Sequence, residues 1–192
     1  MYELLNINSV SEREYEDCYA CMSSEKKARV DAFRFEKDRK RSVCAELLAR
    51  RMLAARCGVG EREIVFGTGS RGKPFAVNVR AEFSVSHSGD YVLCAVGARP
   101  VGADIERMRA VDDRLVHYVC TQEEARYVLS AGSARERETR FFAVWTAKEA
   151  YFKCIGTGIS GLKSVCVLEE AHRARTESFL FQQDYAVSIY TE

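Results

Sequence analysis

Residues 145–153 of this sequence are WTAKEAYFK, and they decide the fold of its second half. The stretch contains no Gly, Pro or turn-forming residue and is rich in helix formers, so it predicts the interior of a helix that ends near Gly156. On such a helix Glu149 and Lys153 are four residues apart and lie on one face. By itself this pair is more typical of an ion pair on a solvated surface than of a functional site.

A second stretch, residues 101–106 with the sequence VGADIE, predicts a strand. Alternation along a strand places its apolar side chains on one face and Gly102, Asp104 and Glu106 on the other. If this polar face meets the polar face of the helix, three carboxylates and one ammonium converge. Three hard oxygen ligands suit Mg²⁺, and a lysine beside them suits a substrate phosphate.

Composition limits the kind of protein to which these groups could belong. With 192 residues, of which 47% are apolar, the chain can bury a substantial core as one domain or as two small ones. The formal net charge of +1 argues against nonspecific binding of nucleic acid. No apolar run approaches membrane-spanning length, and the start, MYELLNINSVSERE, lacks the basic and apolar regions of a signal peptide. We therefore expect a soluble cytoplasmic protein with neither a nucleic-acid nor a membrane partner.

Eight cysteines raise the question of a metal or disulfide framework. Cys18 and Cys21 form a C-x-x-C pattern, but no second pair follows, and a structural zinc site needs four ligands. Without an export signal, reduced thiols that act as small core residues are the favoured interpretation, and a zinc knuckle is the alternative.

The first part of the chain predicts mainly helices. A strand over 2–7 precedes a polar helix over 11–22 and a short helix to residue 33 that Ser24 could cap. A core helix over 36–56 carries apolar residues at helical spacing and ends at Gly58, after which residues 63–66 predict another strand. Basic residues on and before the core helix are consistent with a solvated face or an anion site: Lys26, Lys27, Arg29, Lys37, Arg39, Lys40 and Arg41.

Residues 83–96 predict a hairpin of two strands, 83–86 and 91–96, whose turn is HSGD at 87–90. His87 would lie at that turn, beside the hydroxyls of Ser86 and Ser88. A lone histidine is usually structural or merely exposed. One beside hydroxyls and turn amides can also hold a phosphate through charge-assisted hydrogen bonds.

In the second half, residues 121–124 and 133–136 are capping-box patterns. The first opens a helix to about residue 129, and the second opens the helix that carries WTAKEAYFK. Strands are then predicted over 163–168, 178–181 and 185–190.

A weak repeat links the two halves. Gly89-Asp90-Tyr91 precedes one predicted strand and Gln183-Asp184-Tyr185 precedes another, and each half has one long helix before these strands. A duplicated α+β unit explains this pattern better than one continuous sheet.

These residues resemble a known family. G-x-D-x-E at 102–106, followed by W-x-x-K-E-x-x-x-K at 145–153, resembles the signature of 4′-phosphopantetheinyl transferases. Upstream, Gly72-Lys73-Pro74 and FSVSHSG at 83–89 are similar to segments of the larger class that activates surfactin-type peptide synthetases. The resemblance covers most of the chain, which is shorter than typical members of that class, so we expect loops or the C-terminal tail that touch the carrier protein to be reduced.

For the fold, the resemblance implies a monomer with two similar α+β halves and the active site, with coenzyme A, in the cleft between them. The N-terminal lobe would span residues 1–99 and contact the phosphates and adenosine of coenzyme A. The C-terminal lobe would span residues 100–192 and carry the metal and catalytic residues.

The resemblance also implies roles for individual residues. Asp104, Glu106 and Glu149 match the acids that hold Mg²⁺, with Mn²⁺ as a possible substitute, on the coenzyme A pyrophosphate. Glu149 is also the candidate base for a serine hydroxyl, Lys153 matches the lysine on the pyrophosphate, and both would be catalytic together with Asp104. The other positions implied to contact coenzyme A are Lys26, Arg29, Arg41, Lys73, Ser86, His87 and Lys148.

The implied activity is that of a holo-acyl-carrier-protein synthase type of transferase. It moves 4′-phosphopantetheine from coenzyme A to a serine of an apo acyl or peptidyl carrier protein and releases adenosine 3′,5′-bisphosphate. Two alternatives stay open. A Mg²⁺-dependent phosphodiester hydrolase would use similar groups without a carrier protein, whereas a noncatalytic coenzyme A-binding module would not need all three acids.

Overall fold

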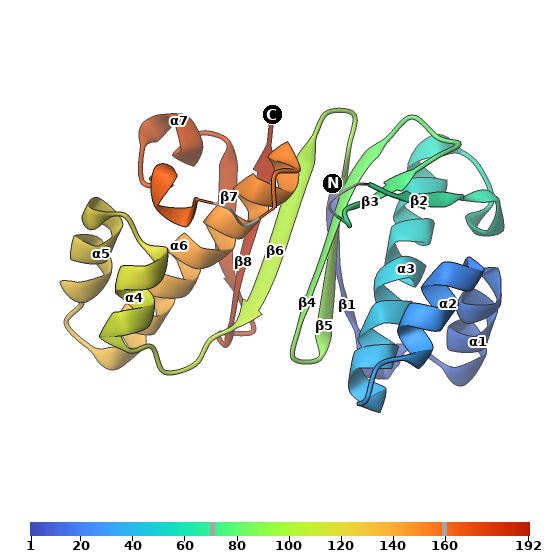
Figure 1. The fold of residues 1–192 in the computed structure, drawn as a ribbon, viewed down its shortest axis with the longest axis horizontal. Coiled ribbons are helices and arrows are strands. Elements are labelled where there is room, and N and C mark those ends of the chain that lie inside the picture. The colour runs from blue at the N-terminus through green and yellow to red at the C-terminus, as the bar shows by residue number, and fades with distance from the viewer. Residues whose placement is uncertain (70–71, 159–160) are drawn as a thin grey trace. The chain divides into compact units, whose positions relative to one another are not determined.

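The computed structural model describes residues 1–69, 72–158 and 161–192. The chain forms two compact units, Met1–Arg99 and Pro100–Glu192, and each combines a three-stranded antiparallel sheet with helices on one of its faces (Figure 1). This confirms the predicted α+β class. Within the described ranges, no helix is long and apolar enough to cross a membrane. The glycine-rich composition of 67–72 also predicts a turn, and part of that turn lies outside the described residues.

The first unit builds its sheet in the order β1-β5-β4 and packs its longest helix, α3, against it. A separate hairpin, β2-β3, follows α3 along the chain. The elements are β1 (Tyr2–Asn6), α1 (Glu12–Cys21), α2 (Ser24–Asp31), α3 (Glu36–Cys57), β2 (Phe66–Thr68), β3 (Pro74–Ala76), β4 (Glu82–Ser88) and β5 (Tyr91–Gly97), with short 3-10 turns at Ile7–Ser9 and Glu61–Glu63.

Helix ends in the first unit follow the capping chemistry of the sequence, with two differences. Ser11 caps α1 in a reciprocal capping box, and α3 ends at Gly58 in the left-handed conformation with φ 69°. The cap of α2 is Ser23, not the predicted Ser24, because the Ser23 hydroxyl accepts the amide of Lys26. The strand predicted over 63–66 is also wrong, since β2 begins only at Phe66.

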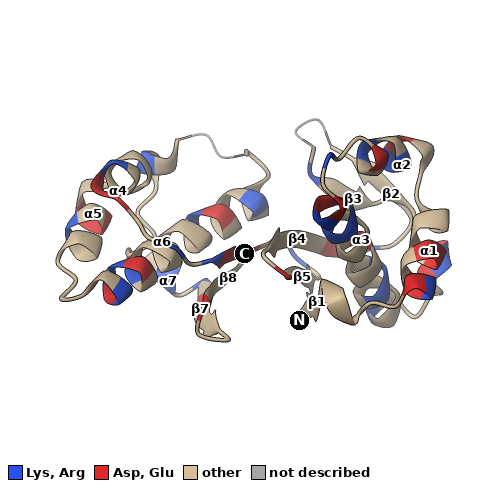
Figure 2. Ribbon diagram, turned by 90° about the horizontal axis from the view of Figure 1, so that it is seen from below, with Lys and Arg blue, Asp and Glu red and all other residues tan. Residues whose placement is uncertain are grey.

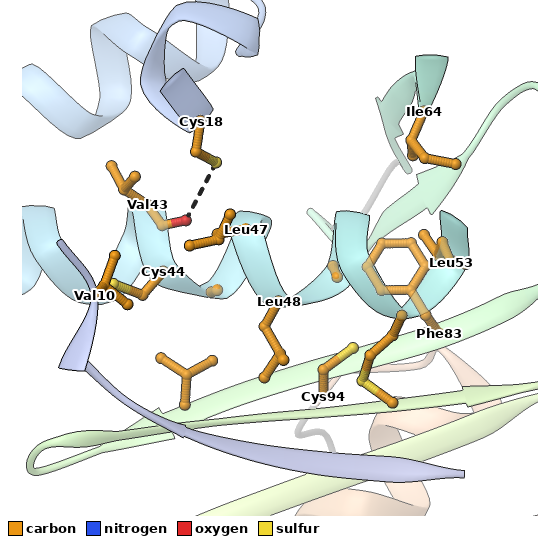
Figure 3. Close-up of a cluster of buried hydrophobic side chains, with 14 of the residues drawn as sticks. Val10, Cys18, Val43, Cys44, Leu47, Leu48, Leu53, Ile64, Phe83 and Cys94 are labelled. Atoms are coloured by element: carbon orange, nitrogen blue, oxygen red, sulfur yellow. Dashed lines mark hydrogen bonds between the residues drawn. The ribbon is translucent and has the colours of Figure 1, made fainter. Parts of the chain in front are cut away.

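The core of the first unit lies between α3 and the sheet (Figure 3). Val43, Leu47 and Leu48 of α3 belong to one buried cluster with Phe83 and Cys94 of the sheet. All eight cysteines lie in the described part of the chain, and each is a free thiol. Burial raises the pKa of both Cys18 and Cys94 to about 12, and the Cys18 thiol donates to the Val43 carbonyl at 3.7 Å. This agrees with the prediction of thiols that act as core residues.

The second unit repeats this plan, with sheet order β6-β8-β7 and α6 packed against the sheet. Thr121 caps α5 in a capping box, as predicted. Ser133 also caps α6, but the Glu136 carboxylate accepts the amide of Gly132 at 2.9 Å instead of closing the predicted box. The elements are β6 (Val101–Arg107), α4 (Asp113–Val119), α5 (Gln122–Leu129), α6 (Ala134–Ile155), α7 (Glu170–Arg173), β7 (Thr176–Phe181) and β8 (Tyr185–Thr191), with a 3-10 turn at Leu162–Ser164.

The strand predicted over 163–168 is wrong, because this segment is a 3-10 turn followed by irregular backbone. Its apolar side chains are buried or half-buried, as in a strand, but its backbone groups bond to side chains instead of a neighbouring strand. The Val165 carbonyl accepts the ammonium of Lys148, and the Val167 amide donates to Glu124 at 2.8 Å.

Equivalent hydrogen bonds show that the two units are similar. Each long helix has 22 residues and ends at a glycine with positive φ, and in each sheet the first strand pairs with the last. The Asp90 carbonyl accepts the amide of Ile7 at 2.9 Å, and the Asp184 carbonyl accepts the amide of Met108 at 2.8 Å. Asp90 and Asp184 are the central residues of the two repeated tripeptides, so the repeat marks equivalent turns before the last strand of each unit.

Candidate active site

Gly102 shows why the polar face of β6 can meet α6. A Cβ atom at this position would lie 1.8 Å from the carbonyl oxygen of Ala150 and 2.6 Å from the amide nitrogen of Cys154. Both distances are to backbone atoms, which cannot rotate away. The backbone of the strand therefore lies directly on the helix, and only glycine fits. Asp104 and Glu106, on the same strand face, follow at the next two positions of the alternation.

Asp104 and Lys153 form the ion pair that joins strand to helix. The Lys153 ammonium donates to Oδ1 of Asp104 at 2.6 Å and to the Ala103 carbonyl at 3.3 Å. Asp104 is only 3% exposed, and Lys153 is half-buried. Glu149 is 6% exposed, so it and Lys153 are not the surface ion pair that their spacing alone would favour.

Glu149 is electrostatically coupled to both acids of β6. Burial is the largest of the effects that together raise the pKa of Glu149 from 4.5 to about 7; the negative charges of Asp104 and Glu106 also raise it, and Lys153 lowers it. Glu149 therefore lies within electrostatic range of Asp104, Glu106 and Lys153. A carboxyl with a pKa near 7 can accept a proton at neutral pH.

This set of donors fits a divalent cation. Three carboxylates with one ammonium leave excess negative charge in a largely buried place, and carboxylate oxygens are the ligands that Mg²⁺ prefers. Within the described ranges, no three acidic, His or Cys side chains are already gathered closely enough to hold a metal. Asp104, Glu106 and Glu149 are the side chains that would hold it.

A chain of three hydroxyls, of which those of Thr146 and Ser188 are buried, begins opposite Asp104, and no pattern in the sequence indicates it. Ser188 of β8 lies opposite Asp104 in the strand register. Its hydroxyl is 2.8 Å from the hydroxyls of both Thr146 and Ser178. Only the pairing of β6 with β8 reveals this proximity, because Ser188 is far from Asp104 along the chain.

Lys148 lies apart from the acids despite its place in WTAKEAYFK. Its side chain has no exposed surface and pairs with Glu124 at 2.8 Å. The ammonium also donates to the carbonyls of Leu162, at 2.6 Å, and Val165. These contacts argue for a structural role instead of the expected contact with coenzyme A.

In the first unit, the start of α3 is tied to the β4–β5 turn by basic side chains. Arg41 donates to the Gly89 carbonyl at 2.8 Å and pairs with Asp38 at 2.6 Å. Lys37 pairs with Asp90 at 2.7 Å. Figure 2 shows further basic residues along α2 and α3. Arg41 thus lies beside the turn that follows β4.

His87 was predicted to lie in the turn, but it lies within β4, where it pairs with Val92. The turn itself is Gly89-Asp90, because the positive φ of Gly89 allows a two-residue connection. The His87 side chain is exposed and Ser86 is half-buried. His87 still lies close in sequence to the turn that Arg41 contacts.

The remaining predicted residues of the first unit have different environments. Lys26 is half-buried and donates to the Ser42 hydroxyl at 2.9 Å, and burial lowers its pKa. Arg29 is exposed on the same helix. Lys73 is half-buried and immediately precedes β3.

Comparison with known proteins identifies the class. The family model described as "4'-phosphopantetheinyl transferase superfamily" matches residues 100–191, and the one described as "4'-phosphopantetheinyl transferase, N-terminal" matches residues 9–99. The chain therefore belongs to the 4′-phosphopantetheinyl transferase superfamily, as its sequence predicted.

Three relatives illustrate the similarity. The chain is 37% identical over 145 residues to 4′-phosphopantetheinyl transferase psf-1 of Bacillus pumilus, covering 74% of this chain and 62% of the relative. It is 36% identical over 124 residues to the transferase gsp of Aneurinibacillus migulanus, covering 64% and 51%. It is 33% identical over 161 residues to the transferase HetI of a Nostoc species, covering 80% and 68%. The matches thus span between half and about two thirds of these relatives.

Proposed function

We propose that this chain transfers the 4′-phosphopantetheine group of coenzyme A to a serine hydroxyl of an apo acyl or peptidyl carrier protein. Adenosine 3′,5′-bisphosphate is the other product. The observation that carries the proposal is the convergence of Asp104, Glu106, Glu149 and Lys153 between β6 and α6 in a member of this superfamily. The specific type is a holo-acyl-carrier-protein synthase.

The reaction needs a base at the serine and positive charge at the pyrophosphate. In this proposal, Glu149 accepts the proton of the serine hydroxyl, whose oxygen forms a bond to the phosphorus nearer the pantetheine. The bond from that phosphorus to the leaving adenosine bisphosphate breaks at the same centre. The raised pKa of Glu149 suits this role. A base whose pKa lies near the working pH binds the serine proton well, and a substantial fraction of it is still deprotonated.

Lys153 stabilises the negative charge that grows on the pyrophosphate oxygens. Asp104 orients this lysine, since its Oδ1 holds the ammonium at 2.6 Å. A bound Mg²⁺, or Mn²⁺ in its place, would supply further charge neutralisation at the phosphates. Asp104, Glu106 and Glu149 would hold that ion.

Coenzyme A has further phosphate groups away from the reacting centre. We assign its 3′-phosphate and pyrophosphate to basic and hydroxyl side chains of the first unit: Lys26, Arg29, Arg41, Lys73, Ser86 and His87. Support comes from Arg41, which lies beside the β4–β5 turn, and from the several basic residues of α2 and the start of α3. A guanidinium binds phosphate with two parallel hydrogen bonds, which favours Arg41 as the anchor.

The proposal extends to the setting in which the chain works. The eight free thiols are consistent with a reducing compartment, which supports a cytoplasmic location. We also propose that the chain acts as a monomer, without nucleic-acid or membrane partners.

Release of adenosine 3′,5′-bisphosphate distinguishes the candidate activities. Coenzyme A and Mg²⁺ are incubated with the protein, with and without an apo carrier protein, and the nucleotide product is quantified by chromatography. The transferase releases the nucleotide only when the carrier is present. Release without the carrier would indicate the phosphodiester hydrolase, and no release in either case would indicate a binding module.

A further inference from the structure

Each unit buries a basic side chain of its long helix: Arg50 in α3 and Lys148 in α6. Each cation donates to a backbone carbonyl 14 residues further along the chain, Arg50 to Ile64 at 2.7 Å and Lys148 to Leu162 at 2.6 Å. Each also pairs with a glutamate of its own unit. We call these two arrangements the Arg50 socket and the Lys148 socket.

The Lys148 socket uses the full hydrogen-bonding capacity of the ammonium. A lysine has three N–H donors, and the three acceptors here are Glu124 Oε2 and the carbonyls of Leu162 and Val165. The side chain of Lys148 has no exposed surface, and all three of its N–H groups are already bonded, so it has no donor left for a phosphate.

Glu124 extends the Lys148 socket to neighbouring elements. Its Oε1 accepts the Val167 amide at 2.8 Å, and its Oε2 accepts the Thr121 amide at 2.7 Å in the capping box of α5. One ion pair therefore joins α5, α6 and the segment 162–167, on the turn of α6 that also carries Glu149.

The Arg50 socket shows that this arrangement does not depend on the acidic site. Arg50 pairs with Glu46 at 2.6 Å and also donates to the carbonyls of Glu61 and Cys21. The residue after Arg50 is Arg51, which pairs with Glu14, whereas the residue after Lys148 is Glu149. The socket thus occurs in both units, but a carboxylate of the proposed active site follows it only in the second.

We propose that Lys148 is a positioning residue. It holds the segment 162–167 against α6 and so fixes the helical turn from which Glu149 projects, and it does not contact coenzyme A. The proposal rests on the proposed transferase function for its catalytic consequence. Its structural part, the coupling of Lys148 to Glu124, is independent of that function.

The structural part is tested by thermal unfolding of Lys148→Met, Glu124→Gln and the double variant. Removal of the lysine alone leaves a buried carboxylate without its cation, so we expect Lys148→Met to lower Tm by roughly 10 °C or to prevent folding. The double variant should recover at least half of that loss, because Gln keeps an oxygen for the Val167 amide and carries no charge. If Lys148→Met is as stable as the wild type, or if the double variant is no more stable than Lys148→Met, the proposed coupling of Lys148 to Glu124 is overturned.

The catalytic part is tested with the folded double variant. We expect its Kd for coenzyme A, measured by calorimetry, to stay within about twofold of wild type, and its kcat to fall about tenfold, since a displaced catalytic group slows the reaction without weakening binding. A tenfold weaker Kd would show that Lys148 contacts coenzyme A, and an unchanged kcat would show that it does not position Glu149. Either result overturns the proposal.

The matched control is Arg50→Met/Glu46→Gln, which opens the other socket. It should lower Tm by a similar amount and leave kcat unchanged, because no proposed catalytic residue follows Arg50. An equal loss of kcat in the control would assign both effects to general destabilisation and would overturn the specific role of Lys148. Failure of the wild-type protein to bind coenzyme A would instead contradict the proposed function. The coupling of Lys148 to Glu124 would then be decided by the unfolding test alone.

Discussion

Gly102→Ala is a single-atom change that tests the contact on which the site depends. The added Cβ would lie 1.8 Å from the Ala150 carbonyl oxygen, whereas ordinary contact begins at 3.4 Å, so strand and helix must separate by the difference of about 1.6 Å. Asp104 is on the strand and Lys153 on the helix, and their 2.6 Å hydrogen bond would break at this separation.

Two measurements quantify the effect of Gly102→Ala. We expect the free energy of unfolding in urea to fall by about 3 kcal/mol, the upper range for overpacking, because the clash is with backbone atoms that cannot rotate away. In a carrier-modification assay, kcat should fall about 100-fold, since the acids on β6 move away from Glu149.

Gly132→Ala is the matched control in the same unit. A Cβ there would lie 3.5 Å from the Glu136 carboxylate, which is ordinary contact, and Gly132 has no positive φ. This variant should differ from wild type by less than about 0.5 kcal/mol. The reasoning is refuted if Gly102→Ala is as stable and as active as Gly132→Ala.

Four further variants probe the charges of the site. Burial and the charge of Asp104 raise the pKa of Glu149 from 4.5 to about 7, so the stability that its protonated form retains below pH 4.5 is lost as the pH rises through 7. Without divalent metal at pH 8, Glu149→Gln should therefore have a free energy of unfolding higher than that of wild type by up to about 2 kcal/mol, and this difference should close toward pH 4.5. Its kcat should nevertheless collapse. A lower Tm than wild type at pH 8 would contradict the raised pKa. Asp104→Ala and Glu106→Ala should stay folded and lose Mn²⁺ binding in calorimetry, and near-normal transfer by either at low Mg²⁺ would exclude it as a ligand. His87→Ala should weaken binding of coenzyme A more than binding of dephospho-coenzyme A, whereas equal losses would exclude a 3′-phosphate contact.

Periodicity in the sequence was enough to predict which residues share a face of β6 and which share a face of α6. The alternation in VGADIE placed Gly102, Asp104 and Glu106 on one face, and the helical spacing of Glu149 and Lys153 placed these two on the facing side. Both patterns are local, because each depends on neighbours within a single element.

The environment of Lys148 could not be predicted, because it depends on partners from other elements. Its ammonium binds Glu124 of α5 and the carbonyls of Leu162 and Val165, and no local pattern indicates that these groups converge. The same contacts explain the missed turn at 162–164. The apolar pattern of this segment correctly indicated burial, but the backbone partners that would make it a strand are replaced by side chains.

His87 was placed wrongly because the length of a hairpin turn depends on backbone conformation. HSGD allows a four-residue turn, but the positive φ of Gly89 permits Gly89-Asp90 alone to connect the strands, so β4 extends through Ser88. Ser188 was missed for a related reason, since its place opposite Asp104 depends on the register between β6 and β8.

The mass of an intact carrier protein tests the central claim most directly. An apo acyl or peptidyl carrier protein is incubated with this protein, coenzyme A and Mg²⁺, alongside a carrier whose acceptor serine is replaced by alanine. The account predicts that the apo carrier gains the mass of one phosphopantetheine group, that the alanine carrier gains none, and that Lys153→Ala slows the gain strongly. An apo carrier whose mass stays unchanged with folded wild-type protein, across both acyl and peptidyl carriers, would contradict it.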